Sequence, residues 1–244
     1  MERISEQKTA AVFSANAIPL TEEQNAVFSR LTEEMLRVND YMNLTAVTEF
    51  GEIAVKHYAD CAVFAQIPPA GCSVCDVGAG AGFPTLPLAI LRPDLKITAV
   101  DSTEKRMRYV AETAAKLGLN GVSVLTARAE EMGKETYRES FDFVTARAVA
   151  PLNILCELCL PLVSVGGTFC ALKAAGGREE LEAARSCAEI LGARVKEVRE
   201  FSLEDPFDTI PPDALKRMLI LFEKTTPTPQ QYPRRYAKIQ SKPL

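Results

Sequence analysis

The 244-residue sequence has one histidine and no apolar run long enough to cross a bilayer. With His57 alone, catalytic triads and histidine-based metal sites are nearly excluded. Residues 1–11 lack the basic start and the apolar stretch of a secretory signal. These absences predict a cytoplasmic protein that does not associate with a membrane.

An excess of positive charge is also missing, since the formal net charge is −4. This argues against a protein that coats nucleic acid through bulk charge, although a local basic face is still possible. The clearest basic segment is residues 225–244, which has no acidic residue and contains Arg234, Arg235, Lys238 and Lys242. Because the same segment has four prolines, we expect no packed helix or strand there.

The seven cysteines include two Cys-x-x-Cys pairs, which begin at Cys72 and Cys156. A zinc site would require the pairs to lie much closer together in the sequence. Both pairs fall in or beside apolar segments, where free cysteine is usually a core residue. We therefore predict core thiols in a reducing compartment, and no metal.

The distribution of apolar residues predicts three segments: a helical extension at 1–66, an α/β core at 67–224 and the basic tail at 225–244. The extension has a capping-box pattern at Thr21 and Gln24, a helix after it, a polar break at 39–48 and a second helix. The core alternates short apolar strands with helices, which is typical of a mostly parallel sheet covered on both faces. The seven expected strands are 73–77, 96–100, 123–126, 141–146, 168–173, 194–200 and 216–223, the last two as an antiparallel pair. The expected core helices are 87–91, 103–117, 152–162 and 178–191.

The most informative motif is a glycine loop that follows the first strand, from Asp76 to Pro84. Gly78, Gly80 and Gly82 stand at alternate positions, where bare backbone lets a ligand approach closely. A dinucleotide-binding fingerprint would need glycine at the position of Phe83. The spacing instead favours the first motif of Rossmann-like class I methyltransferases, which use S-adenosylmethionine. A simple tight turn is the alternative.

Three polar groups follow later strands at the edge where ligands bind in open α/β sheets. Asp101, with Ser102 and Thr103 after it, is placed to accept ribose hydroxyls, or else it caps the next helix. Glu130 is placed to border an adenine, or else it is a solvated charge. Arg147 either binds a carboxylate or phosphate, or forms a structural ion pair.

These motifs together resemble the bacterial 16S rRNA guanine-N(7) methyltransferases, the family called RsmG or GidB (glucose-inhibited division protein B). The matching elements run in order along nearly the whole chain: Asn43-Leu44-Thr45-Ala46, His57, Asp76 to Pro84, Leu86 to Ile90, Asp101-Ser102, Lys105-Arg106, Arg128-Ala129-Glu130, Arg147 to Pro151, Tyr232 to Arg235 and Lys242-Pro243-Leu244. Departures from the family pattern are Thr85 and Ala174, where glycine is expected, and Cys61, where serine is common.

The resemblance implies that S-adenosylmethionine is the cofactor, that S-adenosylhomocysteine is its product, and that no metal is needed. It implies that Gly78 and Phe83 line the cofactor, that Ala129 and Glu130 border its adenine, and that Arg147 belongs to its pocket. The full set of expected cofactor-binding residues is Asp76, Gly78, Ala79, Gly80, Gly82, Phe83, Asp101, Ser102, Thr103, Ala129, Glu130 and Arg147. The implied substrate is one guanosine of 16S rRNA near the decoding site, in free RNA or in the small ribosomal subunit, with no obligate protein partner evident.

Residues that we expect to contact RNA are Asn43, Thr45, His57, Lys105, Arg106, Lys173, Arg234 and Arg235. Most have a structural alternative: Asn43 and Thr45 cap or brace a turn, His57 is a hydrogen-bonded helix residue facing the core, and Lys105 and Arg106 belong to a solvated helix face. For Arg234 and Arg235 the alternative is a disordered tail.

No catalytic residue is assigned, because guanine N7 carries a free lone pair and alignment of the reacting atoms is sufficient. The Asn/Asp-Pro-Pro-aromatic motif of exocyclic-amine methyltransferases is absent after the fourth strand, and no Pro-Cys pair supplies a nucleophile. The sequence leaves three rivals open: a small-molecule methyltransferase, a nicotinamide-dependent oxidoreductase, and a non-catalytic cofactor-binding module.

Overall fold

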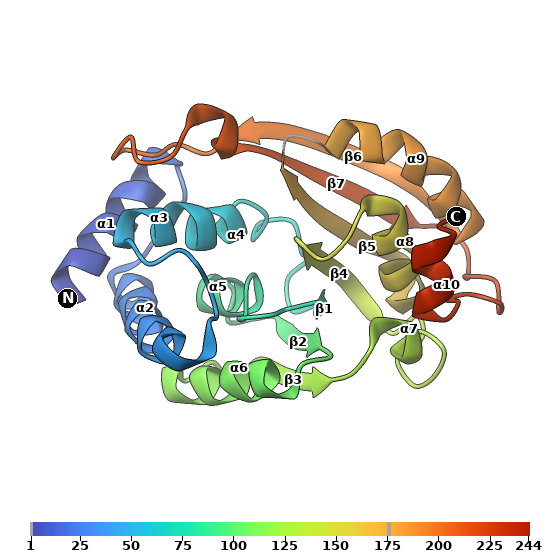
Figure 1. Cartoon of the computed structure of the whole chain (residues 1–244), viewed down its shortest axis with the longest axis horizontal. Helices are drawn as coiled ribbons and strands as arrows, with labels where there is room; N and C mark the ends of the chain where they lie inside the picture. The colour runs from blue at the N-terminus through green and yellow to red at the C-terminus, as the bar shows by residue number, and fades with distance from the viewer. Residues whose placement is uncertain (1, 175–176) are drawn as a thin grey trace.

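A seven-stranded sheet forms the centre of the computed structural model, which describes residues 2–174 and 177–244 (Figure 1). The strands lie in the order β3-β2-β1-β4-β5-β7-β6, with β1 to β5 parallel and β7 antiparallel to both β5 and β6. Their bounds are β1 Ser73–Val77, β2 Lys96–Asp101, β3 Val122–Thr126, β4 Phe141–Arg147, β5 Val163–Ala174, β6 Ala193–Ser202 and β7 Lys216–Lys224. The predicted mostly parallel sheet of seven strands is confirmed.

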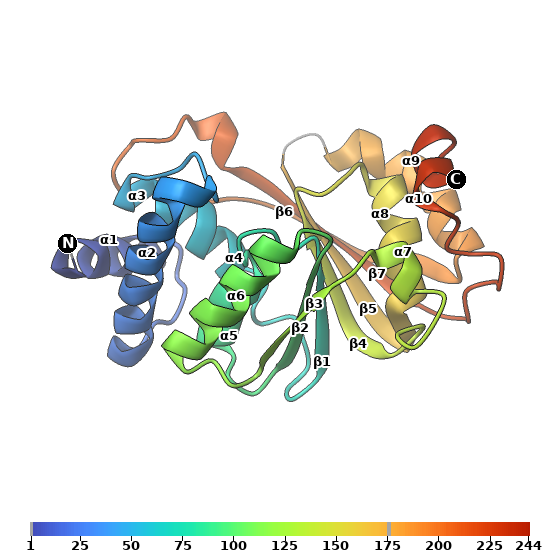
Figure 2. The ribbon, with the colours of Figure 1, turned by 60° about the horizontal axis from the view of Figure 1, so that its bottom comes forward.

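Helices cover both faces of the sheet, because successive strand residues point to opposite sides. In β4, Phe143 packs into the core on one face and Val144 into the core on the other. The first face is covered by α5 (Thr85–Leu91), α6 (Glu104–Leu117) and the N-terminal helices, and the second by α7 (Ala129–Met132), α8 (Leu152–Cys159) and α9 (Gly177–Ile190) (Figure 2). Short 3-10 turns, η2 (Leu160–Leu162) and η3 (Pro212–Leu215), precede β5 and β7.

The N-terminal segment folds as α1 (Glu2–Ala15), α2 (Glu22–Met42), α3 (Phe50–Ile53), the π-helical turn η1 (Ala54–Ala59) and α4 (Asp60–Ala62). The capping box is present, since Thr21 Oγ1 accepts from Gln24 N at 3.2 Å and Gln24 Oε1 accepts from Thr21 N at 3.0 Å. The predicted break at residue 39 is placed too early, because α2 continues to Met42 and ends at Asn43 in the left-handed region. The polar side chain of Asn39 accepts from Thr45 N and thereby braces the chain after the helix.

The C-terminal tail contradicts the expectation that it holds no packed helix. Residues Tyr236–Ser241 form α10, which packs on α8 and buries Ile239 completely (Figure 1). The four prolines all lie outside these six residues, so they do not interrupt the helix. Proline content alone therefore gave the wrong expectation.

All seven cysteines are buried and unpaired, as the prediction of core thiols requires. Within the described residues, no group of three or more His, Cys, Asp or Glu side chains is arranged to hold a metal ion. No described helix combines the length and the apolar character that a membrane crossing needs.

Candidate functional site

The glycine loop joins β1 to α5 at the carboxyl edge of the parallel strands. The amides of Gly78 and Ala79 both donate to the carbonyl of Val100, at 2.8 and 3.0 Å, which fixes the loop against β2. Gly78 has a φ of +75°, and a Cβ there would overlap the side chain of Val149. Glycine is therefore required at this position both for its backbone conformation and for the close approach of a neighbour.

Asp76 lies beneath the loop and is 1% exposed. Its Oδ2 accepts from the backbone amide of Thr85 at 3.1 Å and from its hydroxyl at 2.6 Å, while Oδ1 has no partner. Burial raises the pKa of this carboxyl to about 6, against the lowering effect of the Thr85 bonds. Thr85, one of the departures from the family pattern, thus has a defined role, and the unpaired Oδ1 is a natural acceptor for a ligand's ammonium group.

Asp101, at the end of β2, connects the loop to the start of α6. Its Oδ2 accepts from Gly80 N at 3.2 Å and its Oδ1 from Thr103 N at 2.8 Å. The N-cap of α6 is Thr103, and no side chain caps this helix, so Asp101 braces the turn before α6 and is not its cap. Asp101 also lines a cavity at this edge of the sheet.

A cavity of about 180 Å³ lies between the ends of β1, β2 and β3. It brings together five of the predicted cofactor-binding residues: Gly78, Asp101, Ser102, Ala129 and Glu130. Glu130 is only 7% exposed, so it is not a solvated charge. The other lining residues, which sequence reasoning did not assign to the cofactor, are Val77, Val100, Ala127, Arg128, Val149, Leu158 and Tyr236.

The cavity is smaller than the 300–1,000 Å³ of a typical small-molecule site. The position of Val149 accounts for this, because its side chain lies directly against Gly78 and also lines the cavity. Val149 belongs to the loop between β4 and α8 and is 39% exposed.

Six other residues predicted to bind cofactor do not line this cavity: Asp76, Ala79, Gly80, Gly82, Phe83 and Thr103. Phe83 departs furthest from its expected role. It is 6% exposed and stacks on His57, with 4.6 Å between the ring centroids. The guanidinium carbon of Arg147 lies 5.7 Å from the centroid of the same ring. The structure therefore places Phe83 in a packing cluster that joins the glycine loop to η1.

Arg147 lines a second cavity, of about 510 Å³, on the other side of the β4 loop. Its side chain donates to Asp60 at 2.9 Å and to the carbonyl of Lys56 at 3.0 Å, and Arg217 donates to Asp60 at 2.6 Å. The ion-pair alternative for Arg147 is thus what the structure has. The cavity is lined by Asp60, Arg147, Ala148, Leu172, Lys173, Ala174, Glu180, Ala214 and Arg217.

His57 and Thr45 form a hydrogen bond with 2.9 Å between Nε2 and Oγ1. Thr45 Oγ1 also accepts from Val47 N, so this residue braces the turn after α2. Burial, with a smaller effect of Arg147, lowers the pKa of His57 to about 4, so the imidazole is neutral at physiological pH. Asn43 is exposed at the end of α2, where it is free to contact a ligand.

The other residues expected to contact RNA differ in their exposure to solvent. Lys105, Arg106 and Arg235 are exposed. Lys173 pairs with Glu180 at 2.7 Å, and Arg234 pairs with the fully buried Glu157 at 2.5 Å. Lys173 and Arg234 are therefore held in ion pairs and are mostly covered, each with a side chain 13% exposed.

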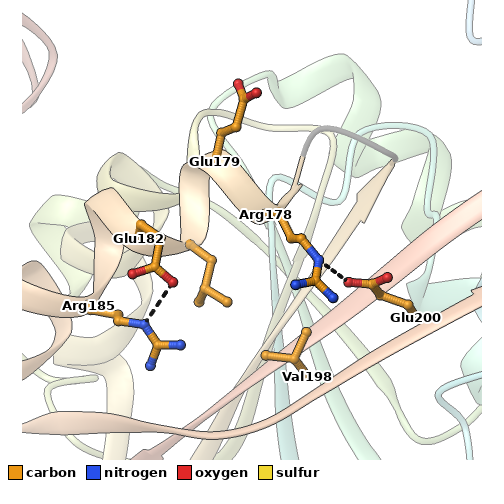
Figure 3. Close-up of a pocket in the computed structure, with 7 residues that line it drawn as sticks. Arg178, Glu179, Glu182, Arg185, Val198 and Glu200 are labelled. Atoms are coloured by element: carbon orange, nitrogen blue, oxygen red, sulfur yellow. Dashed lines mark hydrogen bonds and ion pairs between the residues drawn. The ribbon is translucent and has the colours of Figure 1, made fainter.

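A wider hollow, of about 650 Å³, lies between α9 and β6 (Figure 3). Its charged residues pair with one another, Arg178 with Glu200 at 2.7 Å and Arg185 with Glu182 at 3.2 Å. It shares no residue with the two cavities at the carboxyl edge. It also contains none of the residues that the sequence predicts to bind cofactor or RNA.

Comparison with known sequences gives a consistent result. Residues 24–207 match the family model GidB, described as rRNA small subunit methyltransferase G. The chain is 42% identical over 242 residues to a protein of Lactobacillus delbrueckii subsp. bulgaricus named ribosomal RNA small subunit methyltransferase G, with 97% of each chain covered. Proteins with the same name from Oceanobacillus iheyensis (44% identical over 230 residues, 93% of this chain and 94% of the relative) and Staphylococcus aureus (43% over 234 residues, 93% of each) are equally similar.

Solved structures of distant proteins share the fold. A SAM-dependent O-methyltransferase from Thermotoga maritima matches with a TM-score of 0.54 at 15% identity, covering 80% of this chain and 72% of that one. The structure of M. jannaschii TYW2 in complex with AdoMet matches with a TM-score of 0.52 at 18% identity, covering 68% and 75%. At these identities the likeness concerns the fold alone.

Proposed function

The chain belongs to the family of rRNA small subunit methyltransferase G, and we propose that it methylates N7 of one guanine of 16S rRNA near the decoding site. The observation that carries the proposal is the pairing of two cavities at one sheet edge. One gathers Gly78, Asp101 and Glu130 for a nucleoside cofactor, and the other lies beside Arg147 for the target base. Membership of this enzyme family sets aside the rival oxidoreductase and the non-catalytic module.

The described residues fit S-adenosylmethionine, which supplies an electrophilic methyl group on a positively charged sulfur. Ala129 and Glu130 would border its adenine, and Asp101 would accept from its ribose. The bare backbone at Gly78 and the unpaired Oδ1 of Asp76 suit the amino-acid end. These residues match the adenine, the ribose and the amino-acid end in their chemistry, and none of the proposed contacts requires a metal.

The state of the titratable groups favours a ring nitrogen as the target. N7 of guanine has no proton to remove, so a general base is unnecessary. His57, the sole histidine, has a pKa lowered to about 4, and its ring is held by the hydrogen bond with Thr45 and by stacking on Phe83. The residues of this chain then contribute by holding the two partners in line, an effect worth roughly 7–11 kcal/mol of the barrier.

The cysteines argue against methylation of a pyrimidine carbon, which needs a thiolate nucleophile. All seven are buried, and burial raises the pKa of Cys61 and Cys170 to about 12. A thiol in such surroundings stays protonated and inert.

We assign the target base to the cavity of about 510 Å³ beside Arg147. Asp60 fixes two arginines there, Arg147 and Arg217, in one ion-pair network. Buried networks of this kind hold their side chains in one arrangement, which suits the positioning of a planar base. Asn43, Lys105, Arg106 and Arg235 supply exposed groups elsewhere on the surface for further contacts with 16S rRNA or the small subunit. We expect the enzyme to act in the cytoplasm.

The test supplies labelled S-adenosylmethionine and small ribosomal subunits that lack the modification. We expect label in 7-methylguanosine of 16S rRNA, and label in adenine or cytosine would overturn the proposal. Gly78→Ala should abolish transfer, because its Cβ meets Val149 in the cofactor cavity. Gly118→Ala is the matched control. Gly118 also has a left-handed φ, of +72°, but has nothing within 4 Å, so this variant carries only the strain of about 1–2 kcal/mol and should stay active.

A further inference from the structure

We propose that the C-terminal helix α10 is part of the cofactor site, with Tyr236 as an aromatic wall at its adenine end. The inference rests on the proposed use of S-adenosylmethionine. Tyr236 lines the same cavity as Asp101, Ala129 and Glu130, although it lies far from them in the sequence. It is the one aromatic side chain among the described residues that line this cavity.

The position of Tyr236 is fixed by the way the tail is attached. Arg138 donates to the carbonyls of Gly133, Tyr232 and Thr228 at 2.9, 2.8 and 2.5 Å, which clamps the segment before α10 to the end of α7. Just before the helix, Arg234 donates through its side chain and its backbone to Glu157, whose side chain is 0% exposed. These contacts leave the start of α10 little freedom.

A third anchor lies further back, where the fully buried Lys224 contacts Glu139, the carbonyl of Leu160 and the hydroxyl of Thr228. Ile239, one turn along α10 from Tyr236, is 0% exposed and packs into the same core as Leu158. These contacts fix the path of the chain from Lys224 to α10, and with it the position of Tyr236.

The ring of Tyr236 is also oriented from the cavity side. The guanidinium carbon of Arg128 lies 5.7 Å from its centroid, within cation–π range. Arg128 directly precedes the Ala129-Glu130 pair and lines the same cavity. Tyr236 is therefore held next to the residues expected to border adenine, and stacking of a purine on an aromatic ring is a strong, geometry-tolerant contact.

The ligand class follows from this chemistry: a flat adenine nucleoside gains from the ring, and an amino acid does not. Tyr236→Ala should weaken S-adenosylhomocysteine and adenosine alike, by about 5- to 100-fold. Tyr236→Phe keeps the ring and should bind nearly as the parent does. Gln240→Ala, an exposed position on the same helix, should change nothing.

Binding is measured by calorimetry with S-adenosylhomocysteine and with adenosine, without RNA. In steady-state assays, Tyr236→Ala should raise KM for S-adenosylmethionine and leave kcat at saturation largely intact. If Tyr236 served folding alone, Tyr236→Ala would instead lower the amount of active enzyme. Low temperature would then restore the binding of every ligand to the same extent.

A direct optical readout is available because the sequence has no tryptophan. Tyr236→Trp introduces a single reporter, whose fluorescence should change saturably with S-adenosylhomocysteine at the calorimetric Kd. If the parent binds this ligand while Tyr236→Ala binds it equally well and the tryptophan stays silent, the role of α10 is refuted. If the parent itself does not bind, the proposed function fails instead.

Discussion

At the scale of single residues, burial acts in opposite directions on two titratable groups of the site. It lowers the pKa of His57 to about 4 and raises that of Asp76 to about 6. In the unfolded chain the same groups titrate near 6.5 and 3.9. Both shifts disfavour the charged form, and both therefore link folding to pH.

The signs of the two linkages oppose each other. Between pH 6.5 and 4, unfolded His57 binds a proton that the folded residue does not, so its contribution to stability is lost as pH falls. Between pH 4 and 6, folded Asp76 holds a proton that the unfolded residue has released, so its contribution is lost as pH rises. The two effects partly cancel in the parent protein.

Single substitutions should uncover each effect. His57→Gln keeps a polar partner for Thr45 but does not titrate. As pH falls from 6.5 to 4, the free energy of unfolding should therefore decrease by about 2 kcal/mol less in this variant than in the parent. Asp76→Asn should show the reverse, gaining on the parent by a similar amount between pH 4 and 6. Urea unfolding across this range measures both, and a parallel pH profile for parent and variant would contradict the linkage.

The positions of some residues at the cofactor cavity could be predicted from the sequence, and those of others could not. The structure places Asp101 and Glu130 at the carboxyl edge of the sheet, where sequence also puts them, because residues that follow parallel strands gather at that edge. The stacking of Phe83 on His57 was not predicted, since it depends on how η1 packs against the glycine loop. The contact between Val149 and Gly78 was missed for the same reason.

At the scale of elements, the core strands were predictable from their own apolar residues, whereas α10 was not. Its six residues are too few for a periodic pattern to be detected. The helix depends on tertiary contacts, of which the pair between Arg234 and buried Glu157 is the most specific. Sequence correctly identified the tail as basic but treated its two adjacent arginines as equivalent.

Substitutions should distinguish the roles of these two arginines. Arg234→Ala leaves the Glu157 carboxylate buried with only a backbone donor, and should cost about 3–5 kcal/mol in the free energy of unfolding. Arg235→Ala removes an exposed side chain and should change stability by less than about 0.5 kcal/mol.

Binding to RNA should show the opposite order. Arg235→Ala should weaken binding of the small subunit or its RNA. The slope of log K against the logarithm of the salt concentration should become shallower by about one, the value for one phosphate contact. Thermal unfolding and filter binding at several salt concentrations test the pair. Equal loss of stability in both variants, or an unchanged salt slope for Arg235→Ala, would contradict this division. Adding Glu157→Gln to Arg234→Ala should recover part of the stability, because an amide tolerates burial better than a lone carboxylate.

At the scale of the whole molecule, the N-terminal helices and the sheet share one core. Phe13 of α1 packs on Phe28 of α2 with 5.3 Å between ring centroids, and Phe28 packs on Tyr58. The same apolar cluster includes Val74 of β1 and Phe143 of β4. The sequence indicates an extension and a core because the pattern of apolar residues changes at Ser73. Such a change does not show which faces of the helices and the sheet pack together.

One core predicts one cooperative unfolding transition for the extension and the sheet together. Phe13 is 1% exposed, so Phe13→Ala should remove about 3–5 kcal/mol from the unfolding free energy, whereas Ile4→Ala, at a position on the same helix that is 51% exposed, should have little effect. In the Tyr236→Trp background, tryptophan fluorescence follows the C-terminal helix and far-ultraviolet circular dichroism follows the whole chain. Both signals should shift together in Phe13→Ala, because Phe13 belongs to the same apolar cluster as residues of β1 and β4, and the opposite face of this sheet carries α8 and α10. Two separate transitions would mean that residues 1–66 fold on their own, and the cofactor site would then owe its stability to the strands and the tail alone.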